Sequence, residues 1–89
     1  MNDIIPVQNE NTLAQRVGDE FILLDNVTHQ VHQLNVTASF IWEKCNGERS
    51  SNEIATALTE MFEIQMDQAL TDVKTVLGEL HGKSLLVIK

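Results

Sequence analysis

The stretch LNVTASFIWEKCNGERSSNEIA, residues 34–55, decides the fold. A strand is predicted to end at Leu34. Asn35 then acts as a helix N-cap, because its side-chain oxygen can accept from an unpaired amide one turn on. Apolar side chains recur at i, i+3, i+4 and i+7, which predicts one buried face of a short helix: Ala38, Ile41, Trp42 and Cys45. Gly47 supplies the positive φ that ends this helix.

A second helix is predicted directly after that stop. Ser50 and Glu53 have the spacing of a capping box, in which each side chain satisfies the other's backbone amide. The apolar face of this helix consists of Ile54, Ala55, Leu58, Met61 and Phe62. A third helix is predicted over residues 66–80, with an apolar stripe of Leu70, Val73, Leu77 and Leu80 that Ala69 and Val76 widen. Gln65 is a weak cap for it, and Gly82 is expected just beyond its end.

Three short strands are predicted before the first helix. Residues 13–17 alternate like a half-exposed strand, residues 20–25 are apolar at consecutive positions, and residues 30–34 are polar enough for a sheet edge. The consecutive apolar side chains of Phe21 to Leu24 imply that both faces of that strand are covered. The helices can cover one face. The other face needs the N-terminal arm, a ligand or a second subunit, so a homodimer is one possible outcome.

A chain of 89 residues forms one domain with one core and little room for an enclosed active site. Residues 1–12 are mostly polar and contain Pro6, so we expect a flexible arm there and a single domain over residues 13–89. Residues 84–88 should form a short strand or an extended tail. The predicted core consists of Phe21 or Leu23 with Leu34, Ile41, Trp42, Ile54, Leu58, Val73 and Leu80.

The chain is acidic, with six Lys or Arg against thirteen Asp or Glu and a net charge of -7. Such a surface repels phosphate backbones and anionic lipid, so we expect no nucleic acid and no membrane among its partners. Three strands and three helices in this order suggest a winged helix, whose third helix reads DNA. Asp67, Asp72 and Glu79 on that helix oppose phosphate contacts. A winged-helix DNA-binding or protein-interaction domain is therefore kept only as the alternative function.

Patterns for catalysis or metal binding are missing from the sequence. Cys45, the single cysteine, lies on an apolar helix face and is expected to be a packed thiol, not a nucleophile. His29 and His32 share no helical face and have no cysteines at zinc-site spacing nearby. Phosphate-loop and hydrolase motifs are also absent. We expect no metal, no cofactor and no enzymatic activity. We also expect a cytoplasmic protein, since the sequence has no signal peptide and no apolar run of membrane-spanning length.

An ordered series of short matches runs through residues 20–86. It consists of the apolar second strand followed by Leu34-Asn35, Thr37-Ala38, Ile41-Trp42, Asn46-Gly47, Arg49-Ser50, Glu53-Ile54-Ala55, Phe62-Glu63-Ile64, Asp72-Val73 and Leu77 to Leu80. In this series the chain resembles the PqqD family, the peptide chaperones also called RiPP recognition elements. The resemblance implies an α+β, winged-helix-like fold in which a three-stranded antiparallel sheet precedes three helices.

The resemblance also implies a function. Members of the family bind the leader of a ribosomally synthesised precursor peptide and present it to a modifying enzyme, such as a radical SAM enzyme or a leader peptidase. The leader adds as a strand to the edge of the third strand and lies against the third helix, an arrangement in which main-chain hydrogen bonds give affinity.

Carried over to this chain, the resemblance implies a strand-side site of Gln30, Val31, His32, Gln33 and Leu34. The candidates on the third helix are Leu70, Val73, Lys74 and Leu77. Three of these, Leu70, Val73 and Leu77, fit a role in the core equally well. Lys74 is either a partner for a leader carboxylate or a solvated lysine.

Two departures separate the chain from the chaperone of pyrroloquinoline quinone synthesis. That protein typically has a Pro-Glu-Gly turn before its third strand and an aromatic residue near its end. Here the turn is Asn26-Val27-Thr28-His29, and the chain ends in Leu85-Leu86-Val87 and two further residues. These differences favour a relative that serves another peptide.

Overall fold

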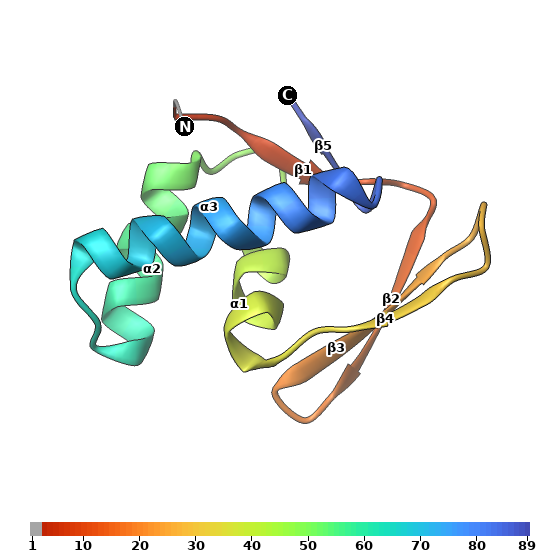
Figure 1. Ribbon diagram of the computed structural model, residues 1–89, viewed down its shortest axis with the longest axis horizontal. Helices are drawn as coiled ribbons and strands as arrows, with labels where there is room; N and C mark the ends of the chain where they lie inside the picture. The colour runs from red at the N-terminus through yellow and green to blue at the C-terminus, as the bar shows by residue number, and fades with distance from the viewer. Residues whose placement is uncertain (1–2) are drawn as a thin grey trace.

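The computed structural model describes residues 3–89 (Figure 1). In chain order the elements are β1 (Pro6–Gln8), β2 (Thr12–Val17), β3 (Glu20–Asp25), β4 (Val31–Gln33), α1 (Val36–Lys44), α2 (Ser51–Phe62), α3 (Met66–Gly82) and β5 (Leu86–Ile88). The central sheet has the antiparallel order β2-β3-β4, and a separate antiparallel pair joins β1 to β5. The predicted α+β fold, a three-stranded antiparallel sheet followed by three helices, is confirmed.

Helix α1 lies between the central sheet and α2 (Figure 1). It starts at the predicted cap, where Asn35 Oδ1 accepts from Ala38 N at 2.8 Å. Its buried side chains Ile41 and Trp42 belong to a core shared with β3, α2 and α3. After the helix, Gly47 has the predicted positive φ of 81° and turns the chain towards α2.

The ends of α2 and α3 show which sequence signals correctly predicted where a helix begins or ends. The capping box is confirmed: Ser50 Oγ accepts from Glu53 N at 3.2 Å, and Glu53 Oε1 accepts from Ser50 N at 2.9 Å. Gln65 makes no side-chain cap for α3, as predicted. The predicted stop at Gly82 is wrong, because Gly82 is still helical and the left-handed residue is Ser84, with φ 59°.

The N-terminal segment is paired, in contrast to the expected loose arm. β1 pairs with β5, with Val7 opposite Val87. Pro6 is buried and does not interrupt the pair, because the main-chain bonds to β5 come from its odd-numbered neighbours: Ile5 O accepts from Lys89 N at 2.8 Å, and Asn9 N donates to Leu85 O at 3.1 Å. The missing N–H of Pro6 therefore points away from β5. The expectation that Pro6 prevents regular pairing is therefore wrong. Residues 1 and 2 of the predicted arm lie outside the described residues.

The same segment caps the start of α2. Asp3 Oδ1 accepts from Ser51 Oγ and from Asn52 N, each at 3.0 Å. Ile4 N donates to Ser51 Oγ at 3.1 Å. The bond from the Asn52 amide is the main reason that the pKa of Asp3 lies below its ordinary value of 3.8. The positive end of α2 is thus already neutralised by this chain's own carboxylate.

One core joins all the layers. Every predicted core residue is buried except Phe21, which packs at the margin while Leu23 takes the central place. The core also includes Cys45, Ala55, Ala69, Leu77, Leu85 and Leu86. The terminal strand β5 therefore belongs to the domain and is not a loose tail.

Asp25 fixes the loop that leads into β4. Its Oδ1 accepts from Val27 N at 2.9 Å and from Thr28 N at 3.2 Å. These two bonds lower the pKa of the Asp25 carboxyl from its ordinary value of 3.8, and the bond from Val27 contributes most. The charged carboxylate therefore stabilises the conformation from which β4 starts.

We expect Trp42→Ala to lower the free energy of unfolding by about 3–5 kcal/mol, because it empties the centre of a close-packed core. Trp42 is 1% exposed and heads the largest fully buried side chains. Urea denaturation followed by circular dichroism measures the loss, with Val27→Ala in an exposed loop as the control. A loss no larger than that of the control would contradict the central position of α1.

We expect Asp25→Asn to be less stable than the parent at neutral pH. A carboxyl whose pKa is lowered on folding contributes stability above its unfolded pKa, and this contribution is lost as the pH falls through the folded value. The difference between parent and variant should therefore shrink below about pH 4. Thermal melts from pH 7 to pH 2 measure it, and Glu60→Gln controls for the loss of one negative charge. A difference independent of pH would show that the charge of Asp25 is irrelevant.

Candidate functional site

β4 has one paired and one free edge. Gln30 O accepts from β3 at 2.9 Å, and Leu34 N donates to β3 at 2.9 Å. Because bonded and non-bonded pairs alternate in an antiparallel ladder, the main-chain N–H and C=O groups of Val31 and Gln33 point away from β3. Within residues 3–89 no strand pairs with this edge. It therefore presents two donors and two acceptors in a row.

A groove separates this free edge from α3. Its main cavity, of about 360 Å³, is lined by Val31, His32, Gln33, Leu34, Asn35, Ala38, Val76, Glu79, Leu80, Lys83 and Leu85. A second hollow of about 250 Å³ shares Asn35 and Val76 and adds Thr37, Asp72 and Thr75. The groove therefore continues along α3 past the end of β4. Its helix residues belong to one face of α3, since Asp72, Val76 and Lys83 are spaced by four and seven residues.

The lining has an apolar floor and a charged rim. Leu34 and Leu80 are buried, and Ala38 and Val76 are half-buried. Of the charged rim residues, Glu79 and Lys83 are exposed and Asp72 is half-buried. The apolar floor can hold apolar side chains of a bound peptide, and the rim can select its charged side chains. The strand edge can bind the main chain of any extended peptide.

Ser39 of α1 anchors the strand side of the groove. Its buried Oγ accepts from Phe21 N at 2.8 Å and donates to Leu34 O at 3.2 Å. The start of β3 and the residue after β4 are thus bonded to the helix that also supplies Ala38 to the groove. This contact therefore fixes the β3–β4 pair on α1.

Four of the five strand residues predicted for the site line the groove: Val31, His32, Gln33 and Leu34. Gln30 precedes β4, and its carbonyl bonds to β3. The groove is also lined by residues outside the predicted set: Asn35, Thr37, Ala38, Asp72, Thr75, Val76, Glu79, Leu80, Lys83 and Leu85. The sequence feature that could have indicated this side of α3 is Val76, which widens the apolar stripe of the helix towards the groove.

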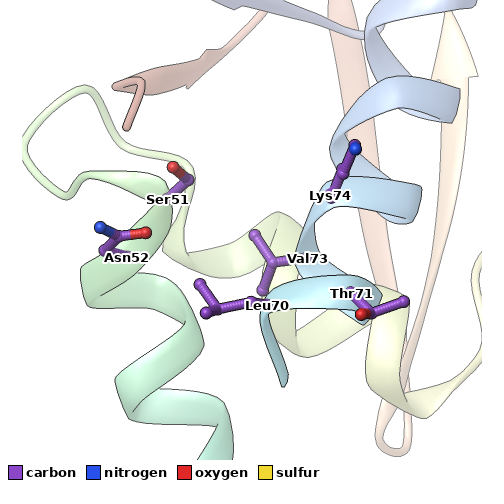
Figure 2. A pocket seen from close by; sticks show the side chains of 6 residues that line it. All are labelled: Ser51, Asn52, Leu70, Thr71, Val73 and Lys74. Carbon is purple, nitrogen blue, oxygen red and sulfur yellow. The ribbon is translucent and has the colours of Figure 1, made fainter. Parts of the chain in front are cut away.

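None of the four predicted third-helix residues lies beside β4. Val73 and Leu77 are each 1% exposed and belong to the core. Leu70, Val73 and Lys74 line a different cavity of about 240 Å³, and Figure 2 shows Leu70 and Val73 pointing from α3 towards the start of α2. The reason is helical geometry: Lys74 is two residues from Val76, hence about 200° away around the helix.

The described residues hold no arrangement typical of an active site. Cys45 is fully buried, and its Sγ donates to Ile41 O at 3.2 Å. Burial raises the pKa of this thiol to about 12, so it stays protonated, and the predicted packed core thiol is confirmed. Residues 3–89 contain no cluster of three or more His, Cys, Asp or Glu suited to a metal. None of the helices in this range is long and apolar enough to cross a membrane.

Two solved structures share this fold. "TbiB1 in Complex with the TbiA(beta) Leader Peptide" is 22% identical with a TM-score of 0.83, and the match covers 90% of this chain and 93% of that one. "Lasso peptide synthetase B1 complexed with the leader peptide" is 20% identical with a TM-score of 0.82, covering 93% of this chain and 98% of that one. At these identities the likeness establishes the fold.

Comparison at the level of sequence adds the family. No curated protein matches the chain significantly. The family described as Coenzyme PQQ synthesis protein D (PqqD) matches residues 20–86, from the start of β3 to the start of β5. Since this match spans well over half of the chain, the protein belongs to the PqqD family.

Proposed function

We propose that this protein is a non-catalytic module that binds the leader of a ribosomally synthesised precursor peptide by strand addition at β4. The observation that carries the proposal is the free edge of Val31 and Gln33, which borders a groove with an apolar floor. An extended peptide could satisfy these main-chain groups and place alternate side chains in the groove. The two solved structures named above are both complexes with a leader peptide, which supports this assignment.

The groove sets the length of the segment that it can read. Asp72 on α3 and Lys83, the residue directly after α3, stand at its two ends and are eleven residues apart, about 16 Å along the helix axis. An extended chain covers that length in about five residues. Every second side chain of the leader would enter the groove, over Ala38, Val76 and Leu80.

The rim predicts the order of charges in the leader. Lys83 marks one end of the groove, Glu79 lies one turn away, and Asp72 lies at the other end near Asn35. A matching leader carries an acidic residue near Lys83 and a basic residue near Asp72. If the leader runs antiparallel to β4, it enters at Asn35 and leaves at Val31, so its basic residue precedes its acidic one.

We propose that the bound peptide is passed to a separate modifying enzyme, of the radical SAM or leader peptidase kind. The one thiol of the chain is buried and protonated, outside the groove. We place this step in the cytoplasm, where ribosomal precursors are made. We also propose a second copy of the chain as a partner, through the opposite edge of the sheet.

We expect Val31→Pro to weaken leader binding about tenfold or more, because one main-chain bond of about 1 kcal/mol is lost and the proline ring crowds the edge. The ladder to β3 survives, since the N–H of Val31 points away from it. Calorimetric titration uses the leader of the precursor gene encoded nearest to this one. Ala14→Pro, the same change at the edge of β2, is the control. Equal binding by parent and folded Val31→Pro would refute strand addition at β4.

We expect Lys83→Glu to lower leader affinity by up to about fivefold, because it removes a partly exposed ion pair with an acidic leader residue that is worth about 0–1 kcal/mol. Lys74→Glu makes the same charge change on the same helix, but on the side away from the groove, and should leave affinity unchanged. Titrations at low and high salt separate this charge contribution from the main-chain bonds. A larger effect from Lys74→Glu would move the site to the cavity of Figure 2.

A further inference from the structure

The central sheet has a second free edge, on β2. Within the described residues, β2 pairs only with β3. Asn26 N donates to Asn11 O at 2.9 Å, which continues the β2–β3 ladder and shows that its odd-numbered residues bond to β3. The N–H and C=O groups of Ala14 and Arg16 therefore point away from the sheet. These two donors and two acceptors equal the number on the free edge of β4.

Apolar side chains lie beside this edge, on the sheet face opposite the helices. Leu13 and Val17 are 56% and 53% exposed. Leu24 lies opposite Leu13, and Val31 lies opposite Leu24, so one apolar row crosses all three strands. The N-terminal segment does not cover this row, because β1 pairs with β5 instead.

This face is nearly free of charge although the chain carries -7. Side chains alternate along each strand, so Leu23, which is fully buried, marks the inner face. Among the residues of β2, β3 and β4 on the outer face, Glu20 is the single charged one. The edge strand β2 has no proline, and its one charged side chain, Arg16 on the inner face, is paired with Glu43 of α1, so few of the usual features that prevent strand pairing between molecules are present.

We infer that β2 pairs antiparallel with β2 of a second copy, about a two-fold axis at Gln15. In this register Ala14 of each copy lies opposite Arg16 of the other, and the two pairs exchange four main-chain hydrogen bonds. Leu13 then lies opposite Val17 of the other copy, on the apolar face. The two symmetry-related Leu13–Val17 pairs are non-hydrogen-bonded pairs, in which side chains approach most closely.

Other registers are less favourable. A two-fold axis at Ala14 places Leu13 opposite Gln15 and loses the apolar pair. An axis at Arg16 places two guanidinium groups opposite each other, which is destabilising. A pairing register shifted by one residue places Ala14 opposite Gln15 of the other copy, whose N–H and C=O groups point towards β3, so the main-chain bonds between the copies are lost. The axis at Gln15 alone combines main-chain bonds with apolar contacts.

The paired sheets would form one sheet of six strands, with the two β4 edges outermost. Both leader grooves stay open, so association and leader binding are independent. Two chains of charge -7 repel each other, and the interface contains no ion pair to offset this. Association is therefore weak and is strengthened by salt. The affinity for the leader, in contrast, should fall with salt, because salt screens the ion pairs at the charged rim.

Sedimentation equilibrium of the full chain tests the proposal at roughly 0.05–1 mM, since small interfaces of this kind are transient. We expect the average mass to rise from 10.0 kDa towards twice that value with concentration and with salt. Ala14→Pro should stay monomeric, whereas Val31→Pro should associate like the parent. A parent that is monomeric throughout, or an Ala14→Pro variant that still associates, would overturn the proposal. Neither result bears on leader binding at β4.

Crosslinking tests the register separately. Gln15→Cys should form a disulfide-linked dimer with oxidised glutathione, because the Cα atoms of a non-hydrogen-bonded pair lie about 4.5 Å apart, within disulfide range. Cys45 is fully buried and should not contribute. Val31→Cys, equally accessible on β4, is the control. Equal crosslinking by the two variants, or crosslinking by Val31→Cys alone, would contradict the β2 interface.

Discussion

The position of α1 between the sheet and the other helices is the constraint on which the remaining structure depends. Trp42 and Ile41 fill the core on one side of the helix. Ser39 bonds to Phe21 N and to Leu34 O, and so holds both strands at the end of the β3–β4 ladder that is nearest the helix. β4 is thereby held against β3 along one edge, while its other edge faces α3. The groove follows from this arrangement, because none of the strands in residues 3–89 fills the space.

Helix α3 serves the core and the groove with adjacent faces. Val73 and Leu77 are buried, whereas Val76 and Glu79 line the groove. This division separates affinity from selectivity. The main chain of β4 can bind any extended peptide, and the side chains of α3 decide which peptide is preferred. Variation on the groove face of α3 can therefore change the partner without disturbing the fold.

Local signals predicted much of the fold, and tertiary contacts decided the rest. Asn35 and the Ser50–Glu53 box act within one turn, so sequence spacing was enough to place them. Pro6 was misjudged because its pairing depends on a strand about eighty residues away. The predicted third-helix residues lie outside the groove for a related reason: an apolar stripe identifies the side of a helix that faces the core. The groove lies on the polar margin of that stripe, and only the placement of β4 shows which margin it is.

Amide hydrogen exchange, measured by NMR on the dilute protein with and without the leader peptide, tests the central claim most directly. The N–H groups of His32 and Leu34 point towards β3 and should be protected in both states. The N–H groups of Val31 and Gln33 should exchange rapidly in the free protein and slowly in the complex. This alternation along β4 is the result that strand addition predicts. Unchanged exchange at Val31 and Gln33, with new protection around Leu70 instead, would contradict it.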